Sequence, residues 1–137
     1  MNANKVRDYL LSKPEAEEDF PFGPDVHVFK VKGKMFALLS FKGGANAEKN
    51  PQINLKCDPL EATQLRDVFD DVVAGYHMNK KHWNTLYLSH VEKTSDIPEG
   101  EVKRQIDNSY GLVVKGLTKS QRCSLELIYT ADELYKK

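Results

Sequence analysis

The sequence predicts an α+β protein, a two-layer sandwich in which an antiparallel β-sheet is packed on one face by helices. Segments with the residue preferences of β-strands occur in two runs, at 26–57 and at 84–88. Segments with helical spacing of apolar residues lie before, between and after these runs. The chain has 137 residues, of which 40% are hydrophobic, enough for one core and too few for two independent ones.

A helix is predicted over 2–13, where Val6, Tyr9 and Leu10 recur at helical spacing and Pro14 follows the last turn. The next stretch, 14–25, holds three prolines and a glycine, which predict a loop through most of its length. This acidic segment contains no basic residue, and its carboxylates are Glu15, Glu17, Glu18, Asp19 and Asp25.

Residues 26–41 read as a β-hairpin, because Gly33 can adopt the positive φ of a tight turn between two β-branched and aromatic runs. A third strand is predicted at 51–57, where apolar and polar residues alternate. Asp58 and Pro59 then predict a helix start, since aspartate caps helices and proline suits their first turn.

After a fourth strand at 84–88, a long helix is predicted over 97–117, with Pro98 in its first turn. Its apolar residues recur every three or four positions: Val102, Ile106, Tyr110, Val113 and Leu117. The tail fits either a strand or a short helix. We therefore expect one domain at 1–118 and a C-terminal extension at 119–137 that packs on the same domain.

Charge and cysteine content exclude several classes of protein. The 20 acidic and 20 basic residues balance, so a uniformly cationic surface for nonspecific DNA or membrane binding is excluded and any such surface must be local. Cys57 and Cys123 form no C-x-x-C pair, which removes support for a zinc ribbon or a redox dithiol. With neither a signal peptide nor a long apolar run, we expect a cytoplasmic protein without membrane contact.

One stretch, "YHMNKKHW" at 76–83, gathers cations and rings without a carboxylate. Its lysines can neutralise phosphates, its asparagine can hydrogen-bond, and its rings can stack on bases. The candidate contacts are Tyr76, His77, Asn79, Lys80, Lys81, His82 and Trp83. The competing interpretation is that Trp83 anchors the core and that the two lysines are solvated surface.

Three motifs occur in order: "EEDFPFGPD", "YHMNKKHWNTLYL" and "IDNSYGLVV". Together with "MFALL" and "INLKCDP" they resemble the MmcQ/YjbR family of small bacterial domains over about residues 3–118. The resemblance implies a CyaY/frataxin-like fold and places Ser109 and Tyr110 as motif residues on the last helix. Members of this family are often described as double-wing DNA-binding proteins, so the resemblance also implies DNA binding.

If the wing description applies, Lys30, Lys32 and Lys34 of the first hairpin supply a second basic strip. Lysines on an edge strand also discourage aggregation, which is the alternative explanation.

Metal and catalytic sites are not predicted. His77 and His82 are five residues apart, which does not match a helical ligand pair, and no further ligand lies close in sequence. The frataxin likeness raises iron at the acidic segment, but the first helix lacks an acidic ridge. Ser109 and Tyr110 fit packing and local hydrogen bonding on an amphipathic helix better than catalysis.

We therefore predict a noncatalytic binding module without a cofactor, a monomer or a weak homodimer. Its preferred partner is DNA at residues 76–83 and the hairpin lysines, and the alternative is a protein or small ligand at the same residues. A further alternative is that Glu17, Glu18 or Asp19 balances the 76–83 cations, within one molecule or between two.

Overall fold

The structure is a computed structural model that describes residues 2–40, 51–75, 78–88 and 95–135. The predicted α+β class is confirmed: six strands form one sheet in the order β1-β2-β3-β4-β6-β5, and all neighbouring strands are antiparallel. The elements, in chain order, are α1 (Ala3–Leu11), β1 (Glu17–Asp19), β2 (Val26–Val31), β3 (Lys34–Ser40), β4 (Gln52–Lys56), α2 (Pro59–Val68), β5 (Val72–Ala74), β6 (Trp83–Tyr87), α3 (Glu99–Lys115), α4 (Lys119–Glu126) and α5 (Ala131–Leu134).

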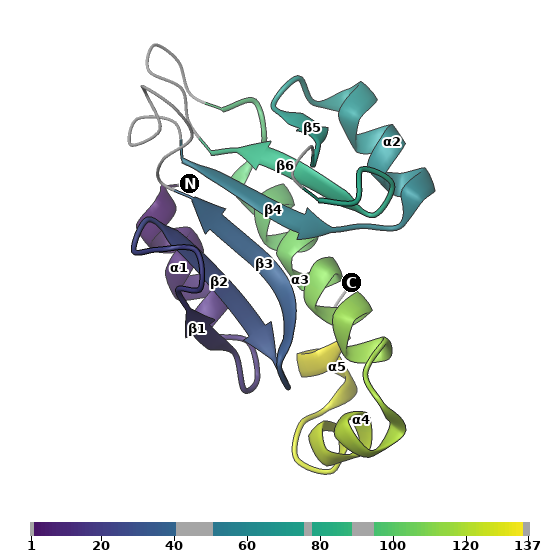
Figure 1. Cartoon of the computed structure of the whole chain (residues 1–137). Coiled ribbons are helices and arrows are strands. Elements are labelled where there is room, and N and C mark those ends of the chain that lie inside the picture. The colour runs from purple at the N-terminus through teal and green to yellow at the C-terminus, as the bar shows by residue number, and fades with distance from the viewer. Residues whose placement is uncertain (1, 41–50, 76–77, 89–94, 136–137) are drawn as a thin grey trace.

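Helices α1 and α3 lie together behind the sheet in Figure 1, and α2 lies beside β5. The long helix α3 packs on the central strands β3 and β4. Its inward side chains meet those of α1 and the sheet in one continuous core. Members of this core with no exposed surface include Val6, Leu10, Phe29, Phe36, Leu39, Ile53, Leu86, Ile106 and Tyr110.

The predicted helix starts are confirmed by their caps. The Asn2 side chain accepts a hydrogen bond from the Lys5 amide at 2.8 Å, and Asp58 caps α2 ahead of Pro59. In the tail, Thr118 and Thr130 form capping boxes with Gln121 and Glu133, and these boxes begin α4 and α5. Of the two conformations that the sequence allowed for the tail, the described residues therefore adopt helices, at Lys119–Glu126 and Ala131–Leu134.

The helical tail joins the main core. Leu125 of α4 is fully buried, Leu134 of α5 is 1% exposed, and both belong to the same hydrophobic cluster as α3. Lys32, at the β2–β3 turn, also donates a hydrogen bond to the Ser124 hydroxyl at 3.3 Å. The described part of the extension thus packs on the rest of the protein.

The β2–β3 hairpin closes through a turn in which both central residues have positive φ. Lys32 has φ of 51° and Gly33 has φ of 79°, the conformation that tight hairpins favour. The hairpin also contains a bulge, because Phe29 pairs with Ala37 whereas Lys30 pairs with Met35. Phe36 is the extra residue.

The bulge explains how Phe36 and its neighbour Ala37 are both fully buried. Strict alternation would send consecutive side chains to opposite faces of the sheet. An extra residue breaks that alternation and lets both side chains reach the helical layer.

Two short edge strands were not predicted. The acidic segment was expected to be a loop through most of its length, but Glu17–Asp19 pairs with β2, Glu18 lying opposite Phe29. Val72–Ala74, expected to lie beyond the second helix, pairs with β6 at the other edge. Each strand has only three residues, too few for an alternating pattern, so backbone pairing with a longer neighbour decides the conformation.

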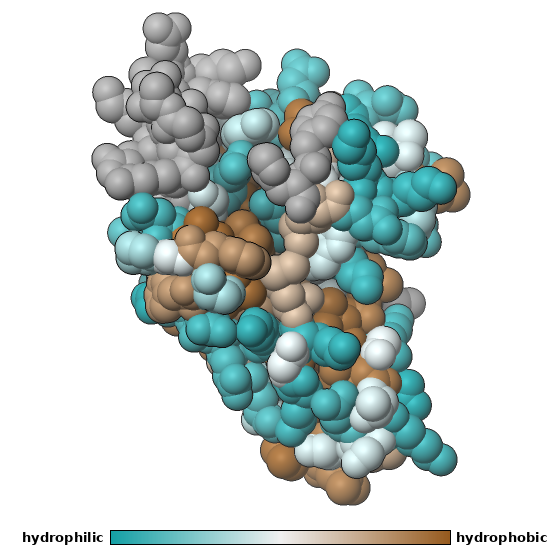
Figure 2. Space-filling model, viewed as in Figure 1, coloured by the Kyte–Doolittle hydropathy of each residue, from teal (hydrophilic) through white to brown (hydrophobic). Residues whose placement is uncertain are grey.

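Hydrophobic surface is distributed unevenly. Figure 2 shows a largely hydrophilic surface over α2 and β5, whereas hydrophobic residues gather over β2 and β3 and at the tip formed by α4. The exposed apolar residues include Phe20 and Phe22 after β1, and Leu127 and Ile128 after α4. Within the described segments no helix has the length and hydrophobicity needed to cross a membrane.

Candidate nucleic-acid interface

The turn before β6 displays the central part of the 76–83 stretch. The Asn79 carbonyl accepts from the amides of His82 at 3.1 Å and Trp83 at 2.9 Å, and its side chain accepts from the Lys81 amide at 3.0 Å. These bonds hold a compact turn that leaves Asn79, Lys80, Lys81 and His82 exposed. Tyr76 and His77 lie outside the described residues.

Trp83 begins β6 and is half-buried, opposite Lys56 of β4. The chain passes close to it at Gly75, whose amide donates to the Trp83 carbonyl at 3.0 Å. A Cβ atom at position 75 would lie 3.1 Å from both the Trp83 Cβ and its carbonyl oxygen. Only glycine permits this approach without displacement, so Gly75 sets where the turn leaves the sheet.

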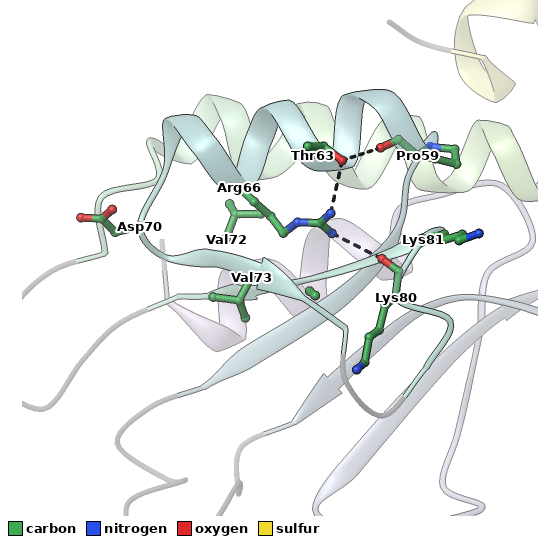
Figure 3. Close-up of a pocket in the computed structure, with 9 residues that line it drawn as sticks. Pro59, Thr63, Arg66, Asp70, Val72, Val73, Lys80 and Lys81 are labelled. Atoms are coloured by element: carbon green, nitrogen blue, oxygen red, sulfur yellow. Dashed lines mark hydrogen bonds between the residues drawn. The ribbon is translucent and has the colours of Figure 1, made fainter.

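The turn faces α2 across an open cavity of about 650 Å³, and we call this site the cationic cavity. Its lining residues come from α2, the following loop, β5 and the turn: Pro59, Thr63, Arg66, Asp70, Val72, Val73, Ala74, Lys80 and Lys81. Figure 3 shows the Arg66 side chain leaving α2 and ending between the helix and the Lys80 backbone. Three cationic residues and one carboxylate therefore share the lining.

Arg66 was not among the predicted site residues. It lies on α2, fourteen positions before Lys80, and the fold alone brings the two together. A signal was present, because Pro59, Thr63 and Arg66 are spaced four and three apart and so share one face of α2.

The hairpin lysines are engaged elsewhere. Lys30 pairs with Asp19 at 3.1 Å, and Lys32 pairs with Glu15 at 3.0 Å. Lys34 is exposed at the start of β3. The acidic segment therefore neutralises two of the three hairpin lysines, so that part of the predicted second basic strip carries little net charge.

The hairpin and the cationic cavity also lie apart. Strands β3 and β4 separate β2 from β6, which corresponds to three strand spacings, roughly 14 Å. In Figure 1 the tip of the β2–β3 hairpin is at the lower end of the sheet, whereas the turn before β6 is at the upper right. The structure does not bring Lys30 and Lys32 together with Lys80 and Lys81 into one platform.

Glu18 and Asp19 of the acidic segment bind side chains and backbone groups of the protein itself. Glu18 binds Arg7 through two contacts, at 2.8 Å to Nε and 2.6 Å to Nη2, and lies 2.7 Å from His27 Nδ1. The hydrogen bonds from Arg7 hold the pKa of Glu18 below its ordinary value. The hydrogen bond from the Phe20 amide, followed by that from Lys30, likewise lowers the pKa of Asp19.

Within the molecule Glu18 and Asp19 thus bind Arg7, His27 and Lys30, and not the described cations of the 76–83 stretch. Within the described ranges, no group of three or more histidine, cysteine or carboxylate side chains is arranged to hold a metal ion.

Ser109, one of the two motif residues on α3, connects the helix to the sheet. Its side chain is fully buried; the hydroxyl donates to the Phe36 carbonyl at 2.6 Å and accepts from the Lys56 amide at 2.8 Å. The β3–β4 pairing ends at Ala37 opposite Leu55, so the hydroxyl bridges the next pair of backbone groups. Ser109 thus supplies hydrogen bonds to two backbone groups that no longer bond to each other where the strands diverge.

Tyr110, the second motif residue, is confirmed as part of the core. Its ring packs edge-to-face on Phe36 with centroids 5.2 Å apart, and its hydroxyl donates to the Pro14 carbonyl at 2.7 Å. Burial raises the pKa of its hydroxyl. The residue therefore fixes the chain just after α1.

A buried polar cluster lies between α1 and α3. Asp107 forms an ion pair with Lys13 and accepts a hydrogen bond from the Tyr9 hydroxyl at 2.6 Å. Both charged side chains are less than a tenth exposed. Burial, followed by the bond to Asp107, raises the pKa of Tyr9. The cluster fixes the angle between two helices that cover the sheet.

Comparison with known proteins places these features in a wider group. A family model described as YjbR matches residues 11–112. Uncharacterized protein YbdF of Escherichia coli O157:H7 is 39% identical over 109 residues, which cover 80% of this chain and 81% of that protein. Uncharacterized protein YjbR of Escherichia coli K12 is 29% identical over 122 residues, covering 89% and 95%.

A similar solved structure is protein DR2400 of Deinococcus radiodurans, described as a DUF419 domain. It superposes with a TM-score of 0.75 at 31% identity, covering 91% of this chain and 88% of that one. A Pseudomonas syringae protein superposes with a TM-score of 0.67, also at 31% identity, covering 82% and 98%.

Proposed function

The chain belongs to the YjbR family, and we propose that it is a noncatalytic binding module that contacts nucleic acid at the cationic cavity and the adjoining turn. One observation supports this function above the others: Arg66 from α2 and Lys80 and Lys81 from the turn line the same open cavity. Clustered cations on a protein whose total formal charge is zero are the local electrostatic footprint of phosphate binding.

The exposed turn adds suitable chemistry beside these cations. Asn79 and His82 are exposed on the same turn, and Trp83 is half-buried immediately after it. Amide and imidazole groups can hydrogen-bond to phosphate or base edges, and exposed ring faces can stack on unpaired bases. The contact surface is smaller than the sequence analysis predicted, because Lys30 and Lys32 are paired with carboxylates.

A second candidate function is binding of a small ligand or a protein partner at the same surface. The shape of the site favours it, because a hollow of about 650 Å³ is in the size range of small-molecule sites, roughly 300–1,000 Å³. A flat, extended nucleic-acid interface would not require such a hollow.

The test is a DNA titration at two salt concentrations with two charge-matched variants. We expect the affinity of the unmodified protein to fall steeply as salt rises. The double variant Lys80→Ala, Lys81→Ala should bind more weakly, with a salt slope smaller by about 1–2 units, since each phosphate-neutralising lysine contributes about one.

The control Lys30→Ala, Lys32→Ala removes the same formal charge from the hairpin and should bind almost as well as the unmodified protein. Equal losses in both double variants would show that only overall charge matters and would contradict the assigned surface. Absence of DNA binding at low salt would remove nucleic acid and leave the second candidate.

A further inference from the structure

Arg66 is held in the cationic cavity by three hydrogen bonds. Its Nη1 donates to the Asn84 side-chain oxygen at 2.9 Å and to the Lys80 carbonyl at 3.3 Å, and its Nη2 donates to the Thr63 hydroxyl at 3.3 Å. Asn84 is 1% exposed, and its amide nitrogen donates to the Ala62 carbonyl, which fixes its orientation. The guanidinium is therefore positioned before any ligand arrives.

The three hydrogen bonds leave two N–H groups of the Arg66 guanidinium without a described acceptor. A guanidinium has five N–H groups, and the three bonds above use both of those on Nη1 and one of those on Nη2. Among the described residues no acceptor is bound to the Nε–H group or to the second Nη2–H group of Arg66. These two nitrogens can together bind two oxygens of one anion.

The protein itself contains an example of this geometry. Arg7 uses its Nε and Nη2 to bind the two carboxylate oxygens of Glu18, at 2.8 and 2.6 Å. Arg104 likewise binds Glu101 and Glu61. In the described part of the chain Arg66 has no carboxylate partner, although it lines an open cavity.

A backbone donor adds to the site. The Gly75 amide donates to Trp83 and the Tyr87 amide donates to Asp71, which sets the alternation of bonds between β5 and β6. In that alternation the N–H group of Ala74 points away from β6, on the unpaired side of the edge strand. Ala74 also lines the cationic cavity, so this outer edge of β5 borders the site that holds Arg66.

The charge of the lining favours a compact dianion. Arg66, Lys80 and Lys81 against Asp70 give a net formal charge of two positive units, 3 − 1. A phosphate monoester carries about −1.5 to −2 at neutral pH and presents three acceptor oxygens. A phosphodiester within a strand carries a single charge, and the hairpin offers no continuous cationic track for a series of them.

We infer that the cationic cavity binds the terminal phosphate monoester of a nucleic-acid strand, with Arg66 as the anchoring side chain. This inference rests on the proposed function for the choice of nucleic acid, and on the Arg66 geometry for the choice of a terminal phosphate. The cavity volume leaves room for the last nucleotide beside its phosphate.

The experiment compares two short single-stranded oligonucleotides that differ only in a terminal phosphate, each labelled with a fluorophore at the other end. We expect the phosphorylated strand to bind about tenfold more tightly or better, because charged hydrogen bonds are stronger than neutral ones. Arg66→Lys keeps the charge but loses the paired donors, and should abolish most of this preference while retaining salt-dependent binding.

The matched control is Arg122→Lys, a partly exposed arginine of α4 paired with Glu126, which should leave the preference unchanged. Thermal unfolding of each variant checks that the fold is intact. If both strands bind equally and with the same salt dependence, the terminal-phosphate inference is wrong and the proposed function stands. A preference that survives Arg66→Lys overturns the role of Arg66.

If neither strand binds, the proposed function fails, and a titration with a mononucleotide monophosphate followed by NMR tests the phosphate site by itself. Saturable shifts of the Ala74 amide and Arg66 Nε–H signals would support the site, and their absence would overturn it.

Discussion

Replacement of Ser109 by alanine should destabilise the fold through two backbone groups rather than through packing. The change removes only a hydroxyl, but Phe36 loses the donor to its carbonyl and Lys56 loses the acceptor for its amide. An unsatisfied buried polar group costs about 1–3 kcal/mol. Because Ser109 is fully buried and the Lys56 side is only part-buried, we expect a loss of about 2–4 kcal/mol in the free energy of unfolding.

Urea unfolding measures this loss. With a urea dependence of about 2 kcal/mol per molar, the midpoint should fall by about 1–2 M. Ser120→Ala is the matched control, an exposed serine of α4 whose change should stay within about 0.5 kcal/mol. Hydrogen exchange at the Lys56 amide should quicken in Ser109→Ala. A stability change no larger than that of the control, with unchanged exchange at Lys56, would refute the bridging role.

Asp107→Ala should cost about 3–5 kcal/mol, because it leaves the buried Lys13 charge uncompensated, whereas the double variant Lys13→Met, Asp107→Leu should recover most of that loss in urea unfolding. A double variant as unstable as Asp107→Ala would contradict this account. Burial raises the pKa of Cys57 to about 11, above its ordinary value of 9.0, so stability should fall as pH rises through that interval, where only the unfolded thiol loses its proton. Cys57→Ala should remove this part of the pH dependence, and the exposed Cys123 should react with thiol reagents much faster than Cys57 in the native protein.

Element types followed from local patterns wherever a segment was long enough to show one. The apolar spacing of α3, the Asp58–Pro59 start of α2 and the Gly33 turn each satisfy a local requirement of backbone geometry or of one buried face. The strands β1 and β5 could not be predicted in this way. Their conformation depends on hydrogen bonds to strands that lie elsewhere in the chain.

The candidate site was predicted in part. The 76–83 stretch drew attention to the turn before β6, and Lys80 and Lys81 of that turn line a cavity. The hairpin lysines were predicted to join them, but charge pairing across β1 and β2 assigns Lys30 and Lys32 to the acidic segment. The sequence could not predict these ion pairs, because the lysines and their carboxylate partners become neighbours only when β1 pairs with β2 at the edge of the sheet.

The family motifs show the same division. The helical periodicity of α3 was enough to place Tyr110 on its buried face. The role of Ser109 could not be predicted from the sequence, because its two hydrogen-bond partners lie 73 and 53 positions away in different strands. The family motif singled out Ser109 without indicating its role. The structure supplies that role, because β3 and β4 diverge next to the bulge and the Ser109 hydroxyl bonds to the backbone groups left unpaired there.

The amino-acid order alone therefore determined the α+β class, the family and the main helices and strands, because those depend on periodicity, caps and turn residues within a few positions of one another. The position of Arg66 beside Lys80, the neutralisation of the hairpin and the backbone bridge at Ser109 were decided by the tertiary structure. Each depends on which strands become neighbours in the sheet, and electrostatic and hydrogen-bond partners are chosen by that proximity in space.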